Sequence, residues 1–541
     1  MTPADTVFLN GCVRTMDRAG TTTTAVAVHD GRIVAVGGDE QVRAMAGPAT
    51  EVVDLAGRAL LPGFQDAHVH PVLAGLAMIR CDLHEAHDAD EALATIRAYA
   101  TANPEATWIS GGGWSMEWFP GGTPSRHELD RVSPDRPVYL TNRDGHGAWV
   151  NTRALRLCGI DAGTPDPADG RIEREPDGAP QGTLHEGAAS IVGRHVPQPT
   201  AEDMLRALQA GQRRMHQAGV TAWQDAMVSP EVQRAYESAA RSGVLTARVV
   251  GALWWDRDRG EEQLPELLAR RTVVGRFRTS SVKIMQDGVA ENFTAAMTSP
   301  YLDGCGCQTG NQGISFIGPD ELREYVTRLD AVGVQVHVHA VGDRAAREAL
   351  DAFEAARKVN GPNGNRHHIA HLQVVHPDDV PRFAALGVTA NIQPLWAAHE
   401  PQMDDLTIPF LGPERAGWQY PFGGLMRTGA HLAAGSDWPV SSPDPFLGIH
   451  VAVNRMIHGE SERAFLPEQR LPLTAALSAY TIGTAWLNHH DDRTGTIEPG
   501  KLADLVITDG DPFSTPPGEL AGITVLATYV EGRLLHRHPD L

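Results

Sequence analysis

The chain has 541 residues, of which 42% are hydrophobic, so it can bury a large core. Its 67 acidic side chains outnumber its 46 lysines and arginines, which gives a formal net charge of −21. Nucleic acids and anionic membranes both need a basic face, so this balance excludes them as expected partners.

The N-terminal residues lack the basic and apolar regions of a signal peptide. No apolar run approaches the ~20 residues needed to cross a bilayer. The five cysteines are few and odd in number. We therefore expect a protein of the reduced cytoplasm.

Both ends of the chain read as β-strands. At the N-terminus, residues 6–11, 25–31 and 32–37 are β-rich and separated by glycine turn signals. Residues 503–508 and 525–533 repeat this pattern near the C-terminus. The sequence predicts one small β-sandwich assembled from residues 1–57 and 491–541.

Between these ends, strand-like runs alternate with amphipathic helices. Residues 201–217 and 319–332 carry apolar side chains at helical spacing, and strand-like runs at 220–225 and 334–339 follow them. Repeated strand–helix alternation predicts a parallel sheet across residues 58–490. The stretch 161–182, rich in glycine, proline and aspartate, is expected to be an extended insertion or loop near the functional site.

Polar side chains with metal-binding groups stand at the ends of the strand-like runs. In chain order they are His68 and His70, Lys283, His337 and His339, His371, and Asp437. Residues i and i+2 of a strand point to one side, so His68 and His70 can reach the same ion. Ligands from such distant strands must converge at one mouth, which favours an eight-stranded (β/α)8 barrel over an open sheet.

This order resembles the amidohydrolase superfamily, in the branch that includes N-substituted formamide deformylase (amidohydrolase family 3, YtcJ-like). The resemblance covers nearly the whole chain. Its carriers are residues 61–70, 144–151, 283–288, 337–345 and 435–439.

The resemblance implies a divalent metal centre, most simply one or two Zn²⁺ ions, with His68, His70, His371 and Asp437 among the ligands. The family draws one ligand from the strand that holds His337 and His339, and the strand-end residue His339 is preferred. His337 then supports the site or contacts the substrate. Lys283 corresponds to a lysine that many members carboxylate to N6-carboxylysine, which bridges two metals. The alternative is a lysine paired with Asp437 or Asp287 beside a single metal.

Three residues are predicted to be catalytic: Asp437, His146 and His337. Asp437 would take a proton from a metal-bound water, as the hydroxide attacks, and pass it to the leaving nitrogen. His146 could donate a hydrogen bond to the developing oxyanion. Nearby aromatic side chains are expected to line an apolar pocket: Trp114, Trp118, Phe119 and Trp149.

The predicted function is hydrolysis of a non-peptide C–N bond, such as that of an N-acyl or N-formyl amine. A cyclic amide hydrolase or deaminase is the alternative, and a lactone, ester or phosphoester hydrolase would use the same ligands. A non-catalytic metal-binding protein is disfavoured because the full ligand set is present. The expected partners are a small-molecule substrate and a second copy of the chain in a homodimer.

Overall fold

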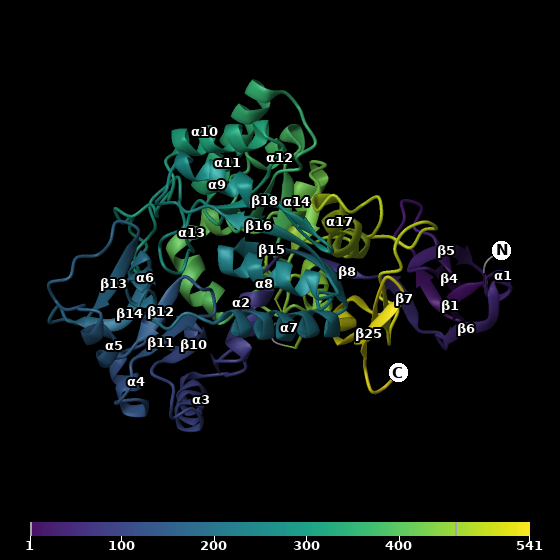
Figure 1. Cartoon of the computed structure of the whole chain (residues 1–541). Helices are drawn as coiled ribbons and strands as arrows, with labels where there is room; N and C mark the ends of the chain where they lie inside the picture. The colour runs from purple at the N-terminus through teal and green to yellow at the C-terminus, as the bar shows by residue number, and fades with distance from the viewer. Residues whose placement is uncertain (1–2, 460–462) are drawn as a thin grey trace.

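A parallel barrel forms the centre of the molecule, as seen in a computed structural model that describes residues 3–459 and 463–541 (Figure 1). Eight strands follow one another around it in chain order, each parallel to the next. They are β8 (Phe64–Val69), β15 (Val220–Val228), β16 (Arg248–Trp254), β18 (Phe277–Met285), β19 (Gln335–Ala340), β20 (His368–His371), β21 (Thr389–Ile392) and β22 (Leu432–Ala434). The short strand β17 (Val273–Val274) pairs with β18 outside this order.

The ring is nearly closed where its last strand meets its first. The backbone N–H of Asp437 donates to the carbonyl of His68 at 2.8 Å. The side-chain amide of Asn391 donates to the carbonyl of Ala67 at 2.9 Å. The prediction of a TIM-like barrel is therefore confirmed, and the carboxyl ends of its strands share one rim.

Helices surround the barrel because each carries one apolar face. Helix α7 begins after Thr200, which forms a capping box with Asp203, and buries Met204, Leu208 and Met215. The predicted helices agree with α7 and α10. The barrel helices are α2 (Pro71–Met78), α7 (Ala201–Gln217), α8 (Pro230–Arg241), α9 (Leu264–Ala269), α10 (Pro319–Ala331), α11 (Asp343–Asn360), α12 (Val380–Leu386), α13 (Ile408–Ala416), α14 (Phe422–Arg427), α15 (Pro445–Asn454), α16 (Leu473–Ser478) and α17 (Thr484–Leu487).

A second α/β unit is inserted between β8 and β15, on the left of Figure 1. Its six-stranded sheet has the order β13-β14-β12-β11-β10-β9. The strands are β9 (Cys81–Asp82), β10 (Ile109–Trp114), β11 (Val138–Asn142), β12 (Gly147–Val150), β13 (Gly170–Arg174) and β14 (Pro180–Glu186), with helices α3 (Ala89–Ala102), α4 (Arg126–Val132), α5 (Thr152–Leu157) and α6 (Gly187–Gly193). Residues 161–182, expected to be an extended insertion or loop, lie within this inserted unit, where β13 pairs with β14 as a hairpin.

The two chain ends contribute two further sheets, on the right of Figure 1. One sheet has the order β5-β4-β1-β6 and the other has the order β25-β24-β23-β7-β2-β3. Side chains from both sheets, including Phe8, Leu60 and Tyr529, share one apolar core. The elements are β1 (Ala4–Leu9), β2 (Cys12–Arg14), β3 (Thr22–Thr23), β4 (Ala25–His29), β5 (Arg32–Gly37), α1 (Asp39–Arg43), β6 (Ala46–Asp54), β7 (Ala59–Pro62), β23 (Leu505–Thr508), β24 (Val525–Val530) and β25 (Arg533–Arg537). A separate sandwich domain with limits at residues 57 and 491 stays a prediction.

The segment that leads to His68 is divided at Gly63. Residues Ala59–Pro62 pair with β2 and β23 in a terminal sheet, whereas Phe64–Val69 is the first barrel strand. A Cβ atom at Gly63 would lie 2.5 Å from Thr221 Cγ2, so only glycine lets the chain pass this close to β15. Among the described residues, no helix is long and apolar enough to span a membrane.

Candidate metal centre

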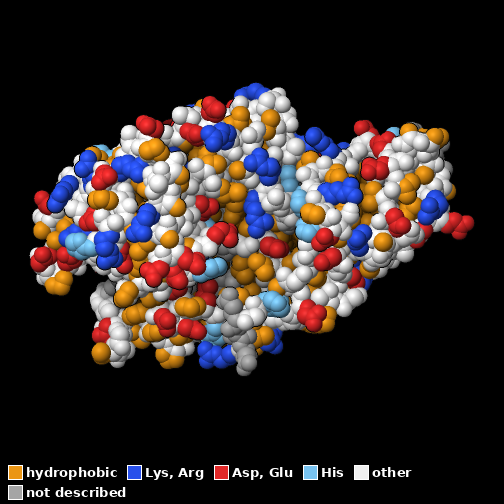
Figure 2. Space-filling view, turned by 90° about the horizontal axis from the view of Figure 1, so that it is seen from below, with side chains coloured by type: hydrophobic (Ala, Val, Ile, Leu, Met, Phe, Trp, Pro, Cys, Tyr) orange, Lys and Arg blue, Asp and Glu red, His pale blue; other side chains and the backbone are white. Residues whose placement is uncertain are grey.

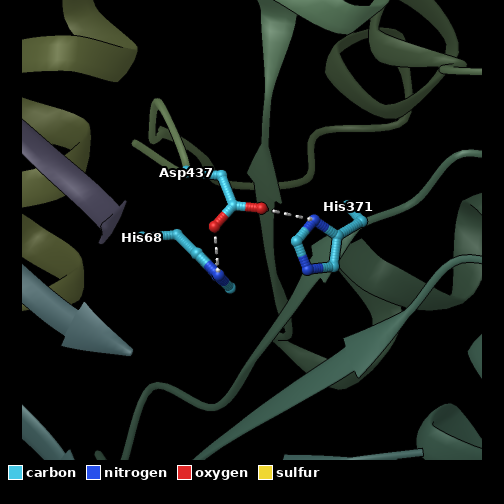
Figure 3. A group of neighbouring side chains, drawn as sticks. All are labelled: His68, His371 and Asp437. Carbon is cyan, nitrogen blue, oxygen red and sulfur yellow. Dashed lines mark ion pairs between the residues drawn. The ribbon is translucent and has the colours of Figure 1, made fainter. Parts of the chain in front are cut away.

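Three buried side chains meet at the carboxyl ends of the barrel strands. An oxygen of Asp437 lies 3.2 Å from His68 Nε2, and its other oxygen lies 3.9 Å from His371 Nδ1 (Figure 3). One donor atom from each of these residues lies within 4.8 Å of the other two. His70 Nε2 is 3.0 Å from the same Asp437 oxygen that faces His68. Strands β8 and β20 and the loop after β22 thus bring three donors together, and His70, which follows β8, lies beside Asp437.

The chemistry of these donors fits a divalent metal ion. Burial lowers the pKa of His68 to about 4 and holds that of His371 well below its ordinary value, so both rings are neutral at pH 7. Neutral imidazole and carboxylate are the ligands that Zn²⁺ and related cations take. His371 Nδ1, which faces Asp437, is buried and has no hydrogen-bond partner among the described residues. A bound cation would satisfy such an orphaned nitrogen.

The loop that carries Asp437 is fixed against the first strand by close packing. A Cβ atom at Gly435 would lie 2.6 Å from the backbone nitrogen of His68, which requires glycine there. The carboxylate of Asp66 accepts hydrogen bonds from the His68 N–H at 3.0 Å and from the Ser436 hydroxyl at 2.5 Å. Asp66 therefore holds the two ligand-bearing segments in register.

Lys283 and His339 stand beside this group on neighbouring strands and line the same cavity. Burial lowers the pKa of Lys283 to about 7, although Asp437 and Asp287 oppose that shift. Among the described residues no carboxylate forms an ion pair with Lys283 within 4 Å, and both the carbamate and the paired lysine stay predictions. His339 Nδ1 is 3.1 Å from Asp287, which leaves its Nε2 free for another partner.

His337 lies one layer behind His68. Its Nε2 is 2.9 Å from His68 Nδ1, and its Nδ1 is 2.8 Å from the side-chain oxygen of Gln224. Its ring also packs on His368, with centroids 4.0 Å apart. Both ring nitrogens of His337 thus have hydrogen-bond partners. His337 is therefore placed to orient the ring of His68 and not to contact a substrate.

His146 faces the barrel from the inserted unit, with its ring centroid 5.6 Å from that of His339. Its Nδ1 is 2.9 Å from Glu186, which also accepts a hydrogen bond from the Thr294 hydroxyl at 2.9 Å. Burial alone would lower the pKa of His146, but the Glu186 carboxylate together with Asp144 and Asp437 outweighs it and the pKa is raised. A cationic or hydrogen-bond-donating ring is therefore directed at the cavity.

The cavity is about 1700 Å³ and lies between the barrel rim and the inserted unit. Of the four aromatic residues predicted to line a pocket, Trp118 does so. The prediction is wrong for Trp114, Phe119 and Trp149, which pack against one another in the core of the insertion. A tryptophan that the sequence analysis missed, Trp396, stacks on His371 with ring centroids 5.2 Å apart.

The chain is similar to a known family and to several known proteins and structures. The profile of the amidohydrolase family matches residues 51–536. The putative amidohydrolase YtcJ of Bacillus subtilis (strain 168) is 30% identical over 98% of this chain and 99% of its own. N-substituted formamide deformylase of Arthrobacter pascens is 30% identical over 98% of both chains. An uncharacterized metal-dependent hydrolase from Pyrococcus furiosus aligns with a TM-score of 0.72 and 25% identity, covering 94% of this chain and 100% of that one.

Proposed function

The chain belongs to the amidohydrolase family, and from that premise we propose that it is a metal-dependent hydrolase that cleaves the amide C–N bond of N-acyl or N-formyl amines. The observation that carries the proposal is the convergence of His68, His371 and Asp437 at the carboxyl rim of the barrel. The likeness to N-substituted formamide deformylase supports the choice of a linear amide.

Six residues are proposed to hold the metal, Zn²⁺ in the simplest case: His68, His70, Lys283 as its carbamate, His339, His371 and Asp437. His339 is preferred over His337 because its Nε2 is free and it lines the cavity. When bound, the metal would supply a Lewis acid that activates water and polarises the scissile carbonyl.

The residues around the metal divide the remaining chemistry. Asp437 is ionised at pH 7: burial would raise its pKa, but His68 and His70 hold it well below the ordinary value. Its carboxylate can take the proton of the attacking water and deliver it to the leaving nitrogen. His146, oriented by Glu186, donates from Nε2 to the carbonyl oxygen as negative charge develops there. His337 fixes the ring of His68.

A substrate panel tests this function. We expect N-formyl and N-acyl benzylamines to be hydrolysed with kcat/KM more than about ten-fold above hydantoin-like rings, lactones and phosphoesters, because the catalytic groups flank a carbonyl and a leaving nitrogen. Product amine is measured by chromatography, and free acid or alcohol from the other classes is measured alongside. Preferred turnover of a ring or a lactone would contradict the proposal.

The carbamate at Lys283 gives a separate prediction. Burial lowers the pKa of Lys283 to about 7, so a substantial share of the amine is uncharged near pH 7, which is the form that reacts with CO₂. We expect Lys283→Ala to hold fewer metal ions per chain than the native protein by elemental analysis, with partial rescue by short carboxylic acids. Native protein loaded with ¹³C-bicarbonate should show a carbamate carbon by NMR that persists in Lys358→Ala, which removes an exposed lysine. One metal ion per native chain with an unmodified lysine would disprove the bridge.

A further inference from the structure

Four carboxylates gather on the cavity wall that continues from His146 away from the metal donors. They are Glu117, Asp144, Glu291 and Glu400; the first two belong to the insertion, and the other two come from the segments that follow β18 and β21. Their hydrogen-bond partners are neutral: Gln402 donates to Asp144 at 3.3 Å, and the Thr407 hydroxyl donates to Glu291 at 2.5 Å. In Figure 2 acidic side chains lie next to a histidine around a hollow near the middle of the visible face.

Holding these acids together is electrostatically unfavourable. Burial, reinforced by Glu117, Asp144 and Glu291, raises the pKa of Glu400 to about 8. Burial also raises the pKa of Asp144 to about 7, with Glu291 adding to that shift. A nearby cation would relieve this repulsion. Arg143 opposes both shifts, yet its guanidinium donates to the His84 carbonyl and lies over Trp118 instead of pairing with a carboxylate.

An independent feature of the same wall points to a ligand. Tyr420 is 2% exposed and lines the cavity. Its hydroxyl makes no hydrogen bond to a described residue, so it is available to a molecule in the cavity. Burial raises the pKa of Tyr420 well above its ordinary value, and Glu291, Glu400 and Asp144 raise it further, which places this hydroxyl beside the acids.

The spacing of the acids argues against a second metal ion. In the part of the chain that the structure describes, the one group of three or more metal-binding side chains with donor atoms within 4.8 Å is His68, His371 and Asp437. The four carboxylates are therefore spread too widely to close around a single divalent ion, which needs its oxygen ligands at about 2.0–2.6 Å. They suit a larger, diffuse cation.

We propose that Asp144, Glu291, Glu400 and Tyr420 form a subsite for an organic cation, an ammonium or guanidinium group of the substrate. The role of this subsite in catalysis rests on the proposed function. If the scissile amide lies between the proposed metal-holding residues and His146, then the group attached to the amide nitrogen or to the carbonyl carbon extends to the acidic wall. The substrate class is then an N-acyl amine that carries a second, positively charged group. Trp118 offers an aromatic face at the same wall.

Binding without turnover tests the subsite directly. The probe is benzyltrimethylammonium, which cannot lose its charge or bind a metal, and benzyl alcohol is the neutral comparison. By calorimetry we expect the cation to bind the native protein at least roughly ten-fold more tightly, with the advantage reduced by added salt. Glu400→Gln and Glu291→Gln should each remove most of that advantage. Asp258→Asn, which removes a charge from an exposed position on the cavity rim, should keep it.

Three results would overturn the subsite. The cation and the alcohol could bind equally well, or Asp258→Asn could weaken cation binding as much as Glu400→Gln does. Elemental analysis could also find a divalent ion in the native protein that is lost in Glu400→Gln. Circular dichroism and the melting temperature establish that each variant is folded. Glu400 has no side-chain hydrogen bond among the described residues, so its replacement by glutamine breaks none.

Turnover separates this proposal from the proposed function. N-formyl-4-(aminomethyl)benzylamine differs from N-formylbenzylamine by one charged aminomethyl group. In the native protein the charged substrate should have the higher kcat/KM, because its KM is lower. In Glu400→Gln this difference should disappear. Equal kcat/KM for the pair would refute the subsite while leaving amide hydrolysis standing. If the acid variants weaken binding of the probe but no amide is hydrolysed, the proposed function is refuted and the subsite stands.

Discussion

Replacing Asp437 with asparagine is expected to lower kcat by roughly 10² to 10⁴, the scale of general acid–base catalysis. Asparagine keeps the size and one oxygen near His68 and His70 but removes the carboxylate that accepts the proton. KM should change little, because the substrate contacts are unaltered. Most of the metal should stay bound, since the histidines supply most of the ligands. Steady-state kinetics and elemental analysis of one preparation measure both quantities.

Asp330→Asn is the matched control for this variant. Asp330 is buried near the end of helix α10, accepts a hydrogen bond from Asn363 at 2.6 Å and does not line the cavity. It should keep near-native kcat even if its melting temperature falls. If Asp437→Asn instead lost metal in step with activity, Asp437 would be chiefly a ligand. Near-native turnover would show that another group, such as His146, moves the proton.

The barrel could be predicted because its strands and helices have simple periodic patterns. Strand β19 and helices α7 and α10 combine β-branched or amphipathic runs with clear ends, so local sequence was sufficient. The inserted unit could not be separated from the barrel, because its strands β10 and β11 are also parallel and also joined through a helix, α4. Which strands share a sheet depends on tertiary pairing that no local pattern reveals.

The same division holds at the metal donors. His68, His70, His371 and Asp437 could be selected from the sequence because each lies at or just after the end of a strand and carries a metal-binding group. The fold brings these side chains together although they lie far apart in the sequence. The sequence could not separate the roles of His337 and His339, because these depend on their hydrogen-bond partners. The partners, Gln224 and Asp287, lie far from the two histidines in the chain.

Other parts of the cavity gave weaker signals. Trp114 and Trp149 looked like pocket residues because tryptophan is amphipathic, yet both are fully buried in the insertion. Glu291, Glu400 and Tyr420 have no common sequence pattern, and only the fold brings them to one wall. An aspartate–glycine–histidine motif predicted His146, but its partner Glu186 depends on the pairing of β12 with β14.

Turnover of an N-formyl amine measured against metal content, before and after chelation, tests the metal-dependent mechanism most directly. We expect a protein stripped of metal to lose all measurable activity, and Zn²⁺, Mn²⁺ or Co²⁺ to restore it, because the residues around Asp437 need an activated water to attack the amide. Incubation with metal-saturated chelator is the control and should leave activity unchanged. Full turnover in a preparation that elemental analysis finds free of metal would contradict the account.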